Sequence, residues 1–212
     1  MNLTEIVVVL DRSGSMHSIR EDIIGGFNTF LKEQKEVPGK ARLTLVQFDH
    51  EYKVVYSGVD IQNVEPLTEK SFIPRGSTAL YDAVGLTMSQ TGERLSQLEK
   101  SKRPEKVLFV IITDGYENSS SEWAGSKISE MIDHQRSKYN WEFMFFGANQ
   151  DAFKVAKNLN IPLGNSMTYH TSGQGVADMS KTFSQAVTTY RTSTGLTDNL
   201  VDSDSKKSKK WN

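Results

Sequence analysis

The chain has 212 residues, a formal net charge of −1 at pH 7 and no cysteine. This length suits one α/β domain, because domains commonly hold roughly 100–200 residues. The lack of cysteine excludes disulfides, zinc–thiolate sites and cysteine nucleophiles, and a charge so close to zero gives no overall field that would attract nucleic acid or anionic membranes.

The first predicted strand covers residues 6–10, which are apolar on both faces and are therefore expected to be buried. An amphipathic helix follows, since Ser18 and Glu21 stand at the spacing of a capping box ahead of apolar residues at helical intervals. We expect this helix to end near residues 37–39, where a proline and a glycine follow each other.

A hairpin and then a second helix are predicted in the middle of the chain. Residues 43–48 and 52–56 both have the composition of strands, and the gap between them is too short for a helical crossover. One antiparallel edge strand is therefore expected. The second helix is predicted over residues 80–98, and a buried strand over 107–113.

The remaining elements are helices and one further buried strand. Helices are predicted at about 124–137, 151–159 and 176–190, and the strand at 141–147. The whole order predicts an α/β fold with a doubly wound, mostly parallel central sheet, one antiparallel edge strand, and helices on both faces.

Side chains that carry oxygen gather where two predicted strands end. Asp11, Ser13 and Ser15 alternate directly after the first strand, and Asp114 follows the strand at 107–113. In an open α/β sheet, ligands bind outside the carboxyl ends of the strands. Two carboxylates brought together there repel each other unless a cation lies between them. Hard oxygen ligands of this kind favour Mg²⁺, Mn²⁺ or Ca²⁺.

Three segments, taken together, resemble the von Willebrand factor A (VWA) domains and their metal-ion-dependent adhesion site (MIDAS). That family has D-x-S-x-S after the first strand, a threonine in a later loop and an aspartate after the fourth strand. The matching residues here are Asp11, Ser13, Ser15, Thr78 and Asp114. The resemblance implies a Rossmann-like sheet and a site for a divalent cation.

The resemblance also implies a role for each residue. Ser13 and Ser15 would bind the metal directly, Thr78 directly or through water, and Asp11 and Asp114 mostly through water. A glutamate or aspartate of a protein partner would complete the coordination. The function implied is a metal-dependent protein-protein interaction module and not an enzyme, with Mg²⁺ as the expected cofactor and Mn²⁺ or Ca²⁺ as substitutes.

The expected domain covers residues 1–191, with the family motifs in 5–159 and a helical elaboration at 170–191, and a polar, basic tail covers 192–212. No run approaches the roughly 20 apolar residues of a membrane span, and no basic leader precedes the first strand. We therefore expect a cytoplasmic protein, similar to cytoplasmic VWA proteins of bacteria or phages, without a membrane partner.

Residues beside the five ligands are expected to form a rim that contacts the partner: His17, Arg75, Ser77, Tyr116, Glu117 and Asn118. Residues 149–151, which follow another strand, are a further candidate. Asp82 is interpreted as a structural residue in the first turn of its helix. Asp11 and Ser13 could instead cap the helix that follows, but capping does not account for Thr78 and Asp114.

Two other functions stay open on the sequence alone. A Mg²⁺-dependent phosphoryl hydrolase also has an aspartate at the end of a strand, but it typically carries a second carboxylate two residues later, where this chain has Ser13. A structural subunit of a larger assembly, with the metal serving stability, is the other alternative. The sequence does not identify the partner or the oligomeric state.

Overall fold

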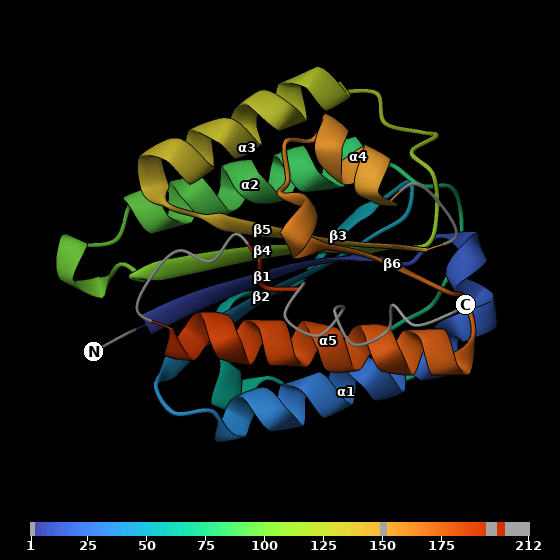
Figure 1. Cartoon of the computed structure of the whole chain (residues 1–212), viewed down its shortest axis with the longest axis horizontal. Coiled ribbons are helices and arrows are strands. Elements are labelled where there is room, and N and C mark those ends of the chain that lie inside the picture. The colour runs from blue at the N-terminus through green and yellow to red at the C-terminus, as the bar shows by residue number, and fades with distance from the viewer. Residues whose placement is uncertain (1–2, 149–151, 194–198, 202–212) are drawn as a thin grey trace, which may run out of the picture.

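A computed structural model describes residues 3–148, 152–193 and 199–201. Within them, the strands form one sheet in the order β3-β2-β1-β4-β5-β6 (Figure 1). All neighbouring pairs are parallel except β2 with β3, which is antiparallel. The predicted fold class is confirmed. The strands are β1 Leu3–Asp11, β2 Lys40–Phe48, β3 Tyr52–Asp60, β4 Lys106–Thr113, β5 Glu142–Ala148 and β6 Ser166–Tyr169.

Helices cover both faces of the sheet (Figure 1). On one face lie α1 (Arg20–Glu36) and α5 (Gly173–Thr192), and on the other lie α2 (Leu80–Ser96), α3 (Gly125–Tyr139) and α4 (Ala152–Asn158). None of the helices among the described residues has the length and apolar character needed to cross a membrane.

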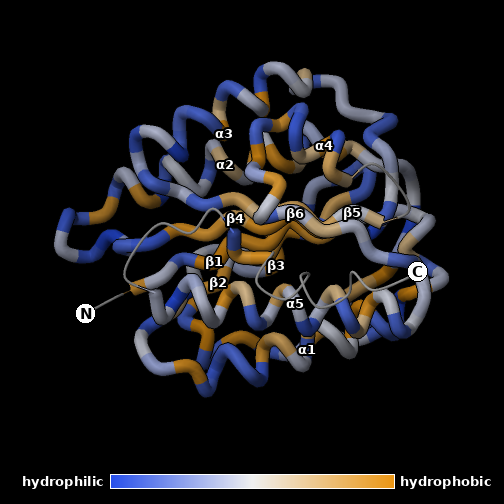
Figure 2. The backbone as a smooth tube through the Cα atoms, viewed as in Figure 1, coloured by the Kyte–Doolittle hydropathy of each residue, from blue (hydrophilic) through white to orange (hydrophobic). Residues whose placement is uncertain are grey.

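The sheet separates two apolar cores, and β1 contributes to both. Ile6, Val8 and Leu10 belong to the core beneath α1 and α5, whereas Val7 and Val9 belong to the core beneath α2, α3 and α4. Alternate residues of a strand point to opposite faces. Figure 2 accordingly shows the central strands as mostly apolar, between helices that alternate in hydropathy. This double burial explains why β1 is apolar without interruption.

The winding of the chain reverses beside β1, and this reversal places the candidate residues. The chain passes from β1 to β2 on one side, and after the β2–β3 hairpin it returns through α2 to β4 on the other side. Both β2 and β4 pair with β1 in parallel. The loops that follow β1 and β4 therefore emerge next to each other at the same edge of the sheet.

The predicted capping box at Ser18 and Glu21 is wrong. A 3-10 helix at Gly14–Ile19 precedes α1, whose N-cap is Ile19, and no side chain caps this end. Ser18 instead donates its hydroxyl to the carbonyl of Ser15 at 3.4 Å. The buried side chains of Met16 and Ile19 anchor this tighter turn, so tertiary packing overrides the local capping pattern.

The structure adds one strand that the sequence pattern did not reveal. β6 has only four residues, too short for a clear alternation of apolar and polar side chains, and it pairs in parallel with β5. Beyond it, α5 begins at Gly173, where the hydroxyl of Ser172 accepts a hydrogen bond from the Gly175 amide at 3.2 Å. The helix therefore extends beyond both ends of the predicted range.

Part of the tail expected from residue 192 onward packs against the domain. Leu200 and Val201 are 3% and 8% exposed. The amide of Leu200 donates to Asn165 Oδ1 and that of Val201 to the Gly164 carbonyl, both at 2.9 Å. Residues 202–212, which include the lysine-rich end, lie outside the described residues.

Candidate functional site

Three loops meet at the carboxyl edge of the sheet, and their hydroxyl and carboxylate groups are in contact. The loop after β1 supplies Ser13 and Ser15, whose Oγ atoms lie 3.1 Å apart. Ser15 Oγ donates a hydrogen bond to Asp114 Oδ1, after β4, at 2.5 Å. Residues 99 positions apart in sequence are thereby joined.

The backbone of Gly115 shows where Thr78 lies relative to these groups. A Cβ atom added at Gly115 would meet Thr78 Oγ1 at 2.8 Å and Ser13 Oγ at 3.5 Å. Both hydroxyls therefore face the same point beside Asp114. A side chain at position 115 would collide with the Thr78 hydroxyl, which accounts for the glycine. The structure thus brings together all five residues singled out from the sequence.

Asp11 is fully buried and organises the first loop. Its Oδ1 accepts a hydrogen bond from the Ser13 amide and its Oδ2 from Thr113 Oγ1, both at 2.6 Å. The pKa of Asp11 is raised to about 6, chiefly by burial and slightly by the nearby charge of Asp114, against the lowering effect of these hydrogen bonds. Burial also raises the pKa of Asp114, while its hydrogen bond from Ser15 lowers it.

The two carboxylates and three hydroxyls form a donor set that fits a hard divalent cation. The causes that act on the pKa of Asp11 and Asp114 include no basic side chain. Arg12, which stands between the two motif positions Asp11 and Ser13, turns its guanidinium to Asp49. In the described part of the chain no three His, Asp or Glu side chains gather as a metal-holding group. Hydroxyl oxygens therefore supply most of this set.

Asp49, in the β2–β3 turn, holds two of the site loops, and the sequence analysis did not single it out. Its Oδ2 lies 3.0 Å from Nε of Arg12 and 3.0 Å from Nε of Arg75. Its carbonyl accepts from the Ala79 amide at 3.0 Å, and the Arg75 amide donates to the Arg12 carbonyl at 2.8 Å. Its position directly after β2, at the carboxyl edge of the sheet, is the sequence feature that could have identified Asp49.

The expected rim residues fall into two groups. His17 and Tyr116 are exposed, Tyr116 by 61%, and Ser77 is partly exposed. Arg75 is exposed but forms ion pairs with Asp49 and Glu51. These side chains are accessible to a partner.

Glu117 and Asn118, also expected on the rim, hold the loops together. The carboxylate of Glu117 accepts from the amides of Tyr81 at 2.9 Å and Ser120 at 2.7 Å. Asn118 Oδ1 accepts from the Thr78 amide at 2.9 Å. These bonds give both side chains a role in positioning the loops, and their expected contact with a partner stays a prediction. Residues 149–151 lie outside the described residues.

The structural interpretation of Asp82 is confirmed. Its carboxylate accepts hydrogen bonds from three successive amides of the loop after β4, those of Ser121 at 2.8 Å, Glu122 at 3.0 Å and Trp123 at 2.9 Å. The start of α2 is thereby joined to the loop that begins at Asp114.

In EDTA, the Asp11→Asn variant is expected to be more stable than the wild type at pH 7. The raised pKa of Asp11 means that the metal-free fold favours the protonated carboxyl, so this stability contribution is present below about pH 4 and is lost as pH rises to about 6. The difference at pH 7 is expected to be about 2–3 kcal/mol. Urea unfolding at pH 4 and pH 7 measures it, and a difference that stays constant between these pH values would contradict the assignment.

Comparisons with known proteins agree with this geometry. A model of the von Willebrand factor type A domain matches residues 5–191, which includes α5 except for its last residue. Among solved structures, the pilus adhesin SpaC from Lactobacillus rhamnosus GG has a TM-score of 0.61 at 14% identity, over 89% of this chain and 30% of that one. Proximal thread matrix protein 1 from the mussel byssus, solved with zinc in its MIDAS motif, has a TM-score of 0.57 at 14% identity, over 88% and 46%.

An archaeal protein also shares the fold. The ArnB paralog VWA2 from Sulfolobus acidocaldarius has a TM-score of 0.54 at 16% identity, over 88% of this chain and 45% of that one. The chain thus spans less than half the length of each of these solved chains. None of the curated proteins compared with it matches.

Proposed function

The chain belongs to the von Willebrand factor type A family, and from this premise we propose that it is a binding module that uses a divalent cation to hold an acidic side chain of a protein partner. Asp11, Ser13, Ser15, Thr78 and Asp114 would hold the cation. The observation that supports this most is the meeting of their oxygens, with Ser15 on Asp114 at 2.5 Å and the hydroxyls of Thr78 and Ser13 around Gly115.

The five side chains contribute in different ways. Ser13, Ser15 and Thr78 present neutral hydroxyl oxygens, whereas Asp11 and Asp114 provide the negative charge. Asp11 already accepts bonds from the Ser13 amide and Thr113, so it acts by fixing Ser13 and by its charge. A divalent cation bound here supplies positive charge with open coordination positions, which a partner's carboxylate can enter.

Mg²⁺ is the proposed cation, with Mn²⁺ or Ca²⁺ as substitutes. Mg²⁺ is typically held by one or two carboxylates and keeps several of its waters, and this donor set has two carboxylates. The mussel protein was solved with zinc in its MIDAS motif, so zinc belongs in any comparison of affinities. A binding series over the four ions decides the order.

We propose that the module performs no turnover of its own. Mg²⁺-dependent phosphoryl hydrolases on similar sheets typically carry a second carboxylate two residues after the first for acid-base work, and this chain has Ser13 at that position. Release of phosphate from a phosphomonoester in Mg²⁺ would favour the enzyme alternative. A cation that raises the melting temperature without any partner capture would favour the structural-subunit alternative.

The Thr78→Ala variant is expected to lose cation-dependent capture of partner proteins. Thr78 is 3% exposed and its hydroxyl faces the same point beside Gly115 as that of Ser13, so alanine removes one donor without adding bulk. Bead-bound protein is incubated with a cell extract in Mg²⁺ or EDTA, and captured proteins are identified. For the wild type we expect at least about tenfold more capture in Mg²⁺ than in EDTA. A contribution of about 1.4 kcal/mol from the cation to the binding free energy already gives that factor.

The matched control is Thr29→Ala on α1, an exposed threonine that bonds only to the Gly25 carbonyl at 2.9 Å within its own helix. It should capture as the wild type does. Melting temperatures of all three proteins test folding. Equal capture by Thr78→Ala, or capture by the wild type that EDTA leaves unchanged, would contradict the proposed function.

A further inference from the structure

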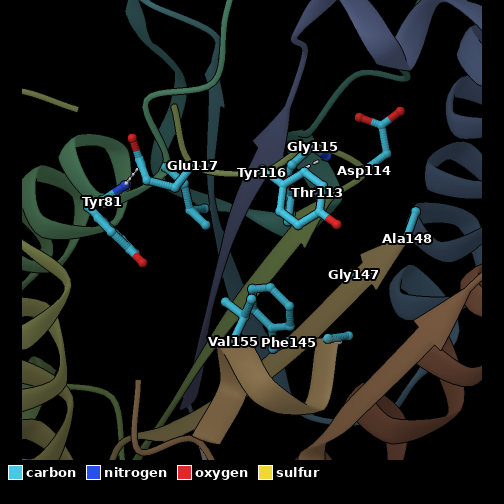
Figure 3. A pocket seen from close by; sticks show the side chains of 12 residues that line it. Tyr81, Thr113, Asp114, Gly115, Tyr116, Glu117, Phe145, Gly147, Ala148 and Val155 are labelled. Carbon is cyan, nitrogen blue, oxygen red and sulfur yellow. Dashed lines mark hydrogen bonds between the residues drawn. The ribbon is translucent and has the colours of Figure 1, made fainter. Parts of the chain in front are cut away.

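An apolar cavity of about 210 Å³ opens beside the candidate metal site (Figure 3). It shares residues 113–115 with that site, so the segment that carries Asp114 forms one wall. The other walls come from the start of α2, from Tyr116, from β5 and from α4. Their main residues are Leu80, Tyr81, Tyr116, Phe145, Ala148 and Val155.

The acidic groups at the edge of this cavity are engaged elsewhere. Glu117 accepts hydrogen bonds from Tyr81 and Ser120 amides, and Asp114 accepts one from Ser15. Figure 3 shows the Asp114 carboxylate directed away from Phe145 and Val155. The interior therefore presents mainly apolar surface, which favours an apolar occupant over a charged one.

The separation between the cavity and the metal site can be expressed as a number of residues in an extended partner segment. Four of the five metal residues follow β1 and β4, whereas the cavity lies at the ends of β4 and β5, one strand further along the sheet. Neighbouring strands are about 4.8 Å apart. An extended chain advances about 3.3–3.6 Å per residue, so one or two residues cover this distance.

We propose that the cavity takes a bulky apolar side chain, such as Leu, Met or Phe, of the same partner segment whose acidic residue reaches the cation. The two side chains are one or two positions apart in that segment. A cavity of about 150 Å³ lined by apolar side chains is enough for benzene, so this one has room for a single such side chain. The inference rests on the proposed function and defines the partner motif that it recognises.

Synthetic octapeptides test the motif directly. Each has a Gly-Ser background with one Asp, and Leu, Phe or Ser at one or two positions to either side. Binding is measured by fluorescence anisotropy in saturating Mn²⁺ and in EDTA. Peptides with Leu or Phe at the preferred position are expected to bind about 10- to 100-fold more tightly than those with Ser, as burial of one large apolar side chain allows.

Two cavity variants and one control test whether the tighter binding of the Leu and Phe peptides arises in the cavity. Tyr116→Ala removes an exposed wall, and Val155→Asn places an amide in the cavity lining. Both should abolish the preference for Leu or Phe. Val155→Asn, which lies outside the expected rim, should also leave the Mn²⁺-dependent binding of the Ser peptide unchanged. Val54→Asn changes a 43% exposed valine on β3 and should keep the full preference.

Each of the other outcomes would contradict the cavity inference, the proposed function or both. Mn²⁺-dependent binding that is equal for Leu and Ser peptides overturns the cavity inference and leaves the proposed function intact. A preference that persists in both cavity variants also overturns it, because the apolar side chain then binds elsewhere. Binding of Leu peptides that is unchanged in EDTA overturns the proposed function, and no binding by any peptide overturns both.

Discussion

The Asp114→Ala variant is expected to bind Mg²⁺ or Mn²⁺ at least about 100-fold more weakly than the wild type. Changes to residues that only support metal ligands already cost about 10- to 100-fold in affinity, and this change removes one of two carboxylates. It also removes the acceptor of the Ser15 hydroxyl. Isothermal titration calorimetry with Mn²⁺ measures the effect.

Asp114 is a better test of the site than Asp11. Asp11 is fully buried and holds Ser13 and Thr113, so its loss changes the loop as well as the charge. Asp114 is only partly buried, and without metal its replacement relieves repulsion between two carboxylates. Asp22→Ala, an exposed aspartate of α1, is the matched control. If Asp114→Ala bound Mn²⁺ with the affinity of the wild type, the proposed metal site would be wrong.

The Asp49→Ala variant is expected to lose about 3–5 kcal/mol of unfolding free energy, because removal of one partner of a buried ion pair is strongly destabilising. Among the acidic side chains that the structure describes, the buried Arg12 would keep only the exposed carboxylate of Glu51, at 3.8 Å. Asp49 is 0% exposed and Arg12 only 6%. The pair is close, at 3.0 Å, but Arg12 Nε has no hydrogen-bond acceptor, so the attraction is mainly one of charge. Urea unfolding at pH 7 measures the loss.

The Arg75→Ala variant tests how much of the stability loss depends on burial, because Arg75 is an exposed ion-pair partner of Asp49. Arg75 contacts the same oxygen of Asp49 at 3.0 Å, but its side chain is 46% exposed. Exposed ion pairs contribute about 0–1 kcal/mol, so this variant should lose little stability. A loss in Asp49→Ala no larger than that in Arg75→Ala would show that burial of Arg12 carries no penalty.

Asp49→Ala should also weaken cation binding, although Asp49 is not among the five donors. Its side chain links the loop that carries Ser13 to the loop that carries Thr78, through Arg12 and Arg75. The two hydroxyls face a common point only while these loops keep their relative position. Residues that orient metal ligands typically contribute about 10- to 100-fold in affinity.

The buried strands and the donors that follow them could be predicted from local pattern because that pattern has a direct physical cause. Thr78 is assigned through the family resemblance. β1, β4 and β5 are buried on both faces, so their apolar runs are continuous and easily recognised. A side chain at the end of such a strand lies at the edge of the sheet in any parallel α/β fold. The sequence therefore predicts that Asp11 and Asp114 lie at one edge of the sheet.

Other features depend on contacts that no local pattern contains. β6 is too short to show an alternation of apolar and polar residues. Ser18 does not cap α1, because Met16 and Ile19 pack into the core and form a 3-10 helix there. The sequence predicts Glu117 on the rim because it follows Asp114, and only the structure shows that its carboxylate accepts a hydrogen bond from the amide of Tyr81, 36 positions away.

The sequence by itself determined the chemistry of this protein: which oxygens are available, at which strand ends, and on what class of sheet. These follow from side-chain type and from periodicity, which act over a few residues. Only the tertiary structure decided how the loops are held, through Asp49 and Glu117, and that an apolar cavity opens between β4, β5 and α4. Such features arise from contacts between distant segments, whose relative position is set by the packing of the whole sheet and its helices.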